Sequence, residues 1–322
     1  MTHLEPHRPA EHSGVHIVVL LPVYNGGRFL GEQLQSILEQ SVQRITILCR
    51  DDASSDDSLA VLARFATQFP QKLVLVEDSL GNLGARANFS RLMQAALDHR
   101  PHDGADGHSP TYFALADQDD VWHADKLATL VAAMQQLEAE RPELPALVHS
   151  DLRVVNEHGG TIAPSMARFQ GLRPDRDSFA AQLMSNTLTG CTALMNRALL
   201  ERSTPVPPQS IMHDWWISLV ASAFGRRMFL NQSLVDYRQH GNNTIGAKEY
   251  VKPVARRHFL ARIMDDRHHA VFLANAAQAE AFAAQFANTL RWNHRLPLAL
   301  ARGLAVHFAP WQRVLFRILR WL

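Results

Sequence analysis

The sequence predicts an α/β fold, in which a mostly parallel, Rossmann-like sheet is flanked by helices and followed by a C-terminal helical extension. Two observations lead to this prediction. Short apolar runs alternate with helical patterns up to about residue 150, as in a doubly wound sheet. Acidic clusters follow two of these runs, and open α/β sheets bind their ligands at the carboxyl ends of the strands.

The first strand is expected over Val15 to Leu21, which is almost continuously apolar. It leads into Pro22-Val23-Tyr24-Asn25, and the glycines that follow favour a turn. Apolar residues at helical spacing then predict a helix that continues to Leu38. This segment is therefore a strand, a turn and a helix.

The second strand is expected to begin at Ile45 and to end in Asp51-Asp52. A carboxylate at the end of a strand can accept the imide N–H of a pyrimidine base, and Asp52 is the preferred candidate. Hydroxyl and carboxyl groups also cap helices, and this is the interpretation of Ser54, Ser55 and Asp56.

The third strand is expected over Lys72 to Glu77. A turn containing Gly84 then opens a helix that carries Arg86 in its first turn. A guanidinium group there can reach a diphosphate or a base, because its donors match phosphate oxygens. The alternative is a surface ion pair.

The fourth strand, Tyr112 to Ala116, ends in Asp117-Gln118-Asp119-Asp120. Carboxylates at positions i and i+2 of an extended backbone project to the same side. A small number of hard oxygen ligands suits Mg²⁺ or Mn²⁺ that keeps positions open for substrate phosphates. The alternative is an acidic, solvated loop. Farther along, Asn156 to Arg176 is expected to be irregular and to form part of an acceptor side.

These four segments, in this order, resemble the motifs of the family 2 glycosyltransferases, which are inverting enzymes with the GT-A fold that use nucleotide-diphosphate sugars. The resemblance covers about residues 15 to 245. Met212-His213-Asp214-Trp215-Trp216 and the run from Tyr237 to Thr244 are most similar to the rhamnosyltransferase branch. A Gln-x-x-Arg-Trp motif is absent, so a processive polymerase is not expected.

The resemblance implies a role for each matching residue. Asp214 is the general base, and its alternative role is capping of the helix that begins at Trp215. Trp215 and Trp216 are candidates for acceptor contacts, one of them being expected in the core because adjacent helical residues diverge. Nucleotide-sugar contacts are implied for Pro22, Tyr24, Asp52, Arg86 and Asp117, and metal contacts for Asp119 and Asp117. Apart from the resemblance, His240 lies between an expected strand and a polar turn, where it can ligate the metal or hydrogen-bond the diphosphate, and the alternative is an ordinary polar role.

The implied activity is metal-dependent, inverting transfer of a sugar from a nucleoside-diphosphate donor to a hydroxyl of a glycan or lipid-linked acceptor in polysaccharide biosynthesis. By the branch resemblance alone the donor is dTDP-L-rhamnose, and the cofactor is Mg²⁺ or Mn²⁺. Two alternatives stay open. A nucleotidyltransferase would need a Gly-rich phosphate loop with a basic residue, which the first turn does not supply. A non-catalytic sugar-binding relative would lack the base or the metal ligands.

Composition limits the remaining classes. The formal net charge of +1 over 322 residues argues against a general nucleic-acid binder. Cys49 and Cys191 are interpreted as buried thiols in a reducing cytoplasm. The expected organisation is a flexible tail at 1–14, a glycosyltransferase domain at 15–250 and a helical extension at 251–322, without a membrane-spanning segment.

The last helix of that extension, expected over Trp311 to Leu322, is amphipathic. Arg313, Arg317 and Arg320 lie on one face, and an apolar stripe containing Leu315 lies on another. The protein is therefore expected in the cytoplasm, with peripheral contact to the inner face of the membrane as one hypothesis. The alternative is docking of the stripe on the catalytic domain or in a homodimer.

Overall fold

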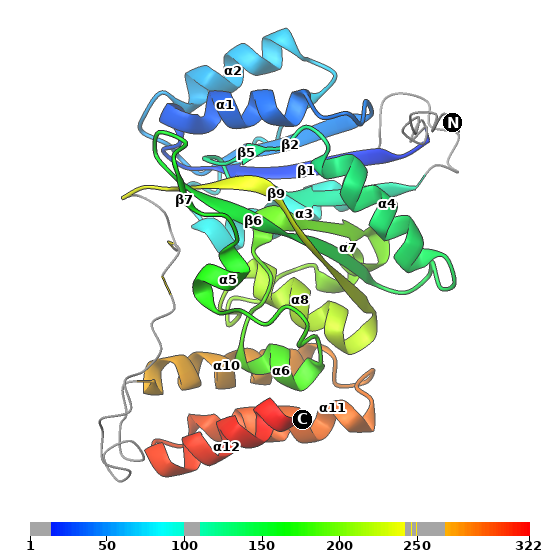
Figure 1. Cartoon of the computed structure of the whole chain (residues 1–322), viewed down its shortest axis with the longest axis vertical. Helices are drawn as coiled ribbons and strands as arrows, with labels where there is room; N and C mark the ends of the chain where they lie inside the picture. The colour runs from blue at the N-terminus through cyan, green and yellow to red at the C-terminus, as the bar shows by residue number, and fades with distance from the viewer. Residues whose placement is uncertain (1–13, 100–109, 242–245, 247–248, 250–267) are drawn as a thin grey trace, which may run out of the picture.

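The computed structural model describes residues 14–99, 110–241, 246, 249 and 268–322. Apart from its last residue, the expected tail at 1–14 lies outside these ranges. In the described part of the chain, a nine-stranded sheet runs through the upper body and three helices lie below it (Figure 1). The strand order is β3-β2-β1-β4-β8-β6-β9-β5, with β7 paired to β6. The strands are β1 (His16–Val23), β2 (Ile45–Asp51), β3 (Leu73–Leu75), β4 (Thr111–Leu115), β5 (Val121–Trp122), β6 (Ala146–Asn156), β7 (Thr161–Ala163), β8 (Ala193–Asn196) and β9 (Arg226–Gln239).

The first half of the sheet is parallel, as the sequence predicts. Strand β1 lies between β2 and β4, with Val19 opposite both Ile47 and Ala114. Alternate β1 residues enter two different cores: Val19 packs on one face of the sheet and Val18 on the other. Because helices cover both faces, the strand is apolar almost throughout. The loops after β1, β2 and β4 consequently meet at one edge.

The helices that cover these faces follow the predicted pattern. On the Val19 face are α1 (Gly27–Leu38), α2 (Ser58–Gln68) and α4 (Lys126–Glu138). On the Val18 face are α3 (Ala85–Asp98), α6 (Phe179–Met184), α7 (Arg197–Ser203) and α8 (His213–Phe224), together with the C-terminal helices.

Beyond β4 the sheet departs from a simple doubly wound order. Strand β8 lies between β4 and β6 and is antiparallel to both, whereas β6 is parallel to β9. The parallel series that the sequence predicts up to about residue 150 therefore stops at β4. A physical reason is that β8 is fully buried and apolar, so Met195 can pair with Phe113 on one side and Leu147 on the other.

The prediction that Asn156 to Arg176 is irregular is wrong. The segment contains β7 and the short helix α5 (Met166–Gln170). The carboxylate of Asp151 organises it by accepting hydrogen bonds from the Ser165 hydroxyl and the Ala167 N–H. The segment is therefore ordered by hydrogen bonds to Asp151, which lies outside it, so its own composition did not predict this structure.

Three C-terminal helices pack beneath the sheet: α10 (His269–Gln285), α11 (Trp292–Arg302) and α12 (Ala309–Trp321). Pro297 lies inside α11, whose pattern therefore continues past the proline rather than breaking there. The proline is buried on the same side of the helix as Leu298 and Ala301. Among the helices that the structure describes, none is both long and apolar enough to cross a bilayer.

Candidate active site

The loops after β1 and β2 are fastened to each other at the carboxyl edge of the sheet. Asn25 has a φ of 49°, and its side-chain oxygen accepts from the Ser55 N–H at 2.8 Å. The Asn25 N–H in turn donates to the Ser54 hydroxyl at 2.9 Å, and the Gly27 N–H donates to Asp56. The residues interpreted as helix caps therefore mainly join two loops.

Gln118, which the sequence interpretation passed over, connects the first motif to the acidic motif. Its side-chain amide accepts from the Tyr24 N–H at 2.8 Å and donates to the Tyr24 carbonyl at 2.9 Å. A Cβ on Gly26 would lie 2.4 Å from the Gln118 Oε1 atom, so any larger residue here would displace the amide that holds Tyr24. Tyr24 itself is half exposed and is held beside the acidic turn.

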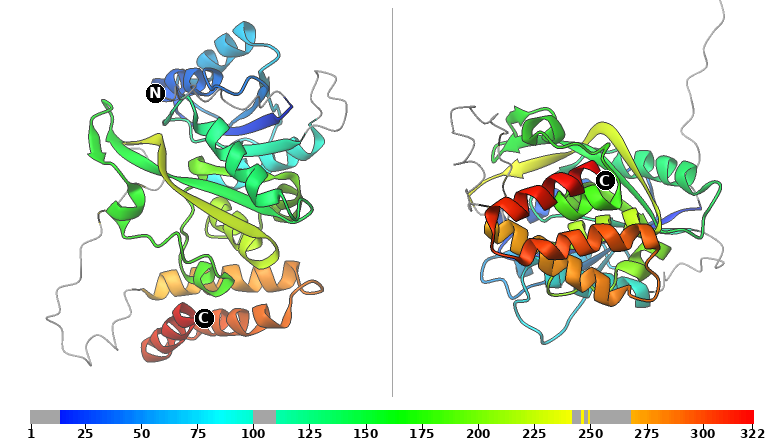
Figure 2. Two further views of the ribbon diagram at one scale, coloured as in Figure 1. Left: turned by 45° about the vertical axis from the view of Figure 1, so that its right-hand side comes forward. Right: turned by 90° about the horizontal axis from the view of Figure 1, so that it is seen from below.

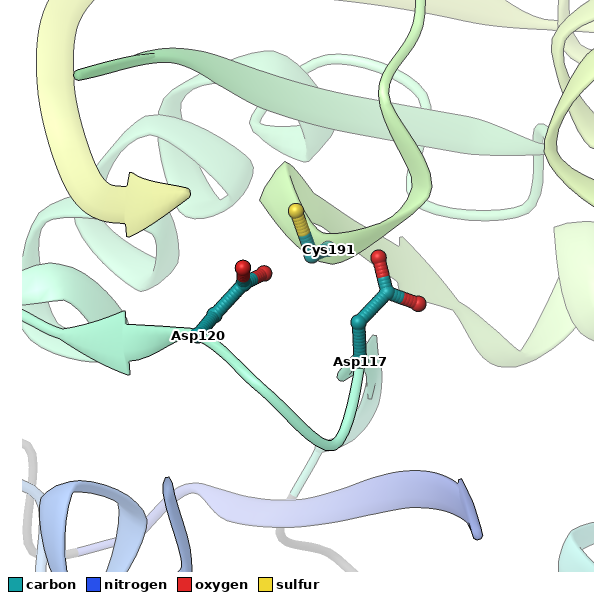
Figure 3. Close-up of side chains that lie close together, drawn as sticks. All are labelled: Asp117, Asp120 and Cys191. Atoms are coloured by element: carbon teal, nitrogen blue, oxygen red, sulfur yellow. The ribbon is translucent and has the colours of Figure 1, made fainter. Parts of the chain in front are cut away.

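The acidic turn gathers carboxylates around a thiol. Ligand atoms of Asp117, Asp120 and Cys191 lie within 4.8 Å of one another, and Asp117 and Asp120 extend from the two arms of the turn toward the side on which Cys191 lies (Figure 3). Burial and the charges of Asp119 and Asp214 raise the pKa of Asp117 to about 7. Burial and its acidic neighbours also raise the pKa of Asp120 well above the usual value. The cluster holds more negative charge than its protein neighbours neutralise.

Asp119 faces a different partner. Its Oδ2 atom lies 2.8 Å from the Nε2 atom of His240, whose ring lies 5.0 Å from that of Phe29. The guanidinium of Arg238 donates to the Asp119 carbonyl and forms an ion pair with Glu32. The structure thus brings together Asp119 and His240, two of the residues expected at a metal. The 242–244 part of the motif that follows lies outside the described residues.

A buried lysine supports this cluster, and the sequence interpretation did not single it out. The Nζ atom of Lys126 donates to the Cys191 carbonyl at 2.7 Å and lies over the Trp122 ring. Burial lowers the pKa of Lys126 to about 7, opposed by the nearby carboxylates of Asp120 and Asp117. A signal existed in the Asp-Lys-Leu that follows the acidic motif, but a lysine at a helix start is usually a surface residue.

Asp214 lies in the first turn of α8, across from the acidic turn. Its Oδ1 atom accepts from the Trp215 N–H at 2.6 Å, so it serves the helix end although Met212 is the N-cap residue. Burial raises the pKa of Asp214 to about 6, against hydrogen bonds that favour its charged form. A Cβ on Gly190 would lie 3.1 Å from the Nε2 atom of His213, the residue before Asp214, so a larger residue there would press on that ring.

The sequence favours Asp52 as the contact to the base, but in the structure the protein itself engages both oxygens of Asp52. Both oxygens of Asp52 accept backbone N–H groups, from Leu83 and Gly84, and Oδ1 also pairs with Arg50 at 2.6 Å. Asp51 instead lines a cavity of about 410 Å³, and its Oδ1 atom has no hydrogen-bond partner among the described residues. Asp52 therefore builds the loop, whereas the Asp51 carboxylate, with one buried and unpartnered oxygen and the other bound by the Ser54 N–H, borders the cavity.

The remaining predicted residues are more scattered. Arg86 donates to the Ser210 carbonyl at 2.8 Å and so joins α3 to the chain before Asp214. Trp216 is fully buried and stacks on Phe286, which places it in the core rather than on an acceptor surface. Trp215 is half-buried. Pro22 pairs with Arg50 near the end of β1, next to the loop that carries Tyr24.

Comparison with known proteins agrees with this geometry. Residues 18–203 match the family described as Glycosyl transferase family 2. Over 270 residues the chain is 24% identical to the dTDP-rhamnosyl transferase RfbG of Shigella flexneri, covering 81% of this chain and 86% of that protein. Over 256 residues it is 23% identical to the putative teichuronic acid biosynthesis glycosyltransferase TuaG of Bacillus subtilis, covering 78% and 89%.

Solved structures share the fold. S. aureus TarS 1-349 in complex with UDP-GlcNAc has a TM-score of 0.52 at 14% identity and covers 89% of this chain and 80% of that one. The mannosyltransferase PcManGT from Pyrobaculum calidifontis, in complex with GDP-Man and Mn²⁺, has a TM-score of 0.51 at 18% identity, covering 94% and 73%. The expected GT-A fold is confirmed, and identities this low support the fold alone.

Proposed function

The chain belongs to glycosyl transferase family 2, and from this premise we propose that it is a metal-dependent, inverting enzyme that transfers a sugar from a nucleoside diphosphate to a hydroxyl of a glycan or lipid-linked acceptor. Glycosyl transfer from a nucleotide sugar follows from the family and its named relatives. A nucleotidyltransferase activity has no support from these matches. The metal, the donor and the acceptor are the proposed parts.

The observation that carries this proposal is that the acidic turn and the carboxylate of Asp214 lie near each other on different elements. The acidic turn follows β4, and Asp214 lies in the first turn of α8. The charge of Asp214 contributes to the raised pKa of Asp117. A single displacement at the anomeric carbon requires a leaving-group site on one side and a base for the acceptor hydroxyl on the other. Asp214 would accept the hydroxyl proton while the acidic turn lies at the diphosphate.

The donor atoms of the turn suit a hard divalent cation. Carboxylate oxygens are the ligands that Mg²⁺ and Mn²⁺ prefer. Burial raises the pKa of both Asp117 and Asp119, and for Asp117 the charges of Asp119 and Asp214 add to the shift, so a cation here would favour the charged carboxylates. We assign Asp117 and Asp119 to the cation, with His240 holding Asp119 in orientation. Burial and the nearby carboxylates of Asp120 and Asp117 raise the pKa of the Cys191 thiol well above its usual value, and a neutral thiol is a poor ligand for a hard cation. When bound, the cation offsets the negative charge that develops on the leaving diphosphate.

The base of the donor is proposed to occupy the 410 Å³ cavity at the ends of β2 and β3. Asp51 would accept a base N–H with its unpartnered oxygen, and Tyr24 and Pro22 would border the nucleotide. Arg86 would have a positioning role, because its hydrogen bond to the Ser210 carbonyl holds the chain that precedes Asp214. Trp215 is the remaining candidate for an acceptor contact.

Asp51 and Asp52 can be separated by experiment. Asp51→Asn should weaken nucleotide binding about tenfold, the scale of one hydrogen bond to a charged group, with little change in melting temperature. Asp52→Ala should instead lower the free energy of unfolding by about 1–3 kcal/mol, because the Leu83 and Gly84 N–H groups lose their acceptor while Arg50 keeps its ion pair with Asp78. Calorimetric titration and thermal unfolding of both variants measure the two effects. The opposite pattern would return the base contact to Asp52.

The proposed donor is dTDP-L-rhamnose, by similarity to a relative named for that substrate. In a thermal-shift panel with Mn²⁺, it should raise the melting temperature more than UDP-GlcNAc or GDP-mannose, since a ligand selective for the folded state stabilises it. Release of nucleoside diphosphate only on addition of an acceptor then tests transfer. Stabilisation by another nucleotide sugar alone would overturn the donor but keep the family activity.

A further inference from the structure

The outer surface of α11 and α12 is separate from the site described above. These helices form the lower end of the molecule in Figure 1, and seen from below they lie across its near side (Figure 2). We call this surface the α11–α12 face. It is made of residues 291–322 together with the cavity that α12 shares with the segment before α6.

Tryptophans are concentrated and exposed on this face. The chain has six tryptophans, of which Trp122 and Trp216 are buried. Trp292 is 85% exposed and Trp321 is 92% exposed, and Trp311 is also exposed. Tryptophan combines a large apolar ring with one polar N–H, and it is enriched where proteins meet the interface of a bilayer. Exposure of three such rings in 32 residues is costly in water alone.

Helix α12 has a buried apolar side, an exposed apolar side and a side that carries its arginines. Leu315 and Leu319 are buried, so part of the apolar stripe docks on the protein itself. A second apolar side stays exposed at positions i, i+3, i+7 and i+10, which align on a helix. Its members are Trp311, Val314, Ile318 and Trp321. The docking expected from the sequence therefore accounts for only half of the apolar surface of this helix.

The charged residues of α11 and α12 themselves are all basic. Between residues 281 and 322 the chain contains arginines but no aspartate or glutamate. Arg302 forms an ion pair with Glu280 of α10. The arginines are Arg291, Arg295, Arg302, Arg313, Arg317 and Arg320. Such a surface is complementary to an anionic partner.

A cavity of about 740 Å³ adjoins the exposed apolar side. Its walls include four arginines and the side chains of Trp321 and Leu322. Two acids also line it, and one of them, Asp175, is bound by Arg173 through two hydrogen bonds. Guanidinium groups match the geometry of phosphate oxygens. The arginines that line the cavity are Arg176, Arg313, Arg317 and Arg320.

We propose that the α11–α12 face binds the surface of an anionic phospholipid bilayer, with the tryptophan side of α12 inserted at headgroup depth and the arginine-lined cavity receiving lipid phosphates. A second copy of the chain fits less well. A symmetric dimer through this face would bring the arginines of one copy against those of the other, and of the two acids in the cavity Asp175 is already bound by Arg173.

Vesicle flotation of the full chain tests the proposal. At low salt the protein should float with vesicles that contain phosphatidylglycerol and not with vesicles of phosphatidylcholine alone, and added salt should weaken binding. The double variant Arg317→Gln/Arg320→Gln should lower the partition coefficient about 25-fold, at about fivefold for each arginine near the surface. Trp321→Ser should weaken binding as well, because it removes an inserted ring.

The matched control is Arg64→Gln/Arg197→Gln, which removes the same charge from exposed arginines elsewhere. It should keep nearly full binding, and all variants should keep the melting temperature of the parent. Equal losses in the control and test variants would reduce the effect to net charge and overturn the assignment of this face. Absence of flotation at low salt would overturn it too, as would a dimer that the test variant dissociates without any change in vesicle binding.

Discussion

Asp214→Asn is expected to lower turnover by at least about a hundredfold while donor affinity stays unchanged, because loss of a positioned general base removes a hundredfold or more. The substitution is nearly isosteric and keeps an oxygen that can accept the Trp215 N–H. The start of α8 should therefore remain intact. Steady-state kinetics, donor titration and thermal unfolding of the variant separate these effects.

The pH profile gives an independent measure of the same group. The pKa of Asp214 is raised to about 6 by burial, and a base works only in its ionised form. Turnover of the parent should thus be full above that pH and should fall about tenfold per unit below it. In Asp214→Asn this limb should be lost. Near-parental turnover with an unchanged profile would leave Asp214 with only its role at the helix end.

Asp119→Ala is expected to abolish the part of nucleotide-sugar binding that depends on a divalent cation. Removing a group that merely orients a metal ligand costs about 10- to 100-fold, so loss of a ligand should weaken binding by at least about a hundredfold. Asp119 is buried against His240, and its removal also releases that ring. Calorimetric titration of the donor with and without Mn²⁺ measures the difference.

The control for this variant is Asp125→Ala. Asp125 belongs to the same stretch of sequence, is exposed and makes no side-chain cap to α4. It should bind donor and cation as the parent does, and both variants should unfold cooperatively. If Asp119→Ala kept its cation-dependent affinity, the assignment of the acidic turn as the metal site would have to be abandoned.

The strands of the parallel half could be predicted because each is a short apolar run that ends in polar residues. The run before Pro22 became β1, and the run before Asp117 became β4. Prediction was weaker where a contact remote in sequence decides local structure. Asp151 orders the segment around Ser165, and β8 enters the sheet between β4 and β6. Neither event leaves a periodic pattern in its own segment.

The sequence by itself determined the family, the parallel half of the sheet and the placement of the acidic motif at the end of β4, because these depend on local periodicity and on residues adjacent in the chain. Only the tertiary structure decided which of two neighbouring carboxylates is engaged. Asp52 is held by Arg50 and two N–H groups, whereas one oxygen of Asp51 has no hydrogen-bond partner among the described residues. It also divided the apolar surface of α12 between the core and solvent. The reason is that identical residue types differ in role only through the partners that folding brings to them, and adjacent carboxylates or successive helical turns look alike until those partners are in place.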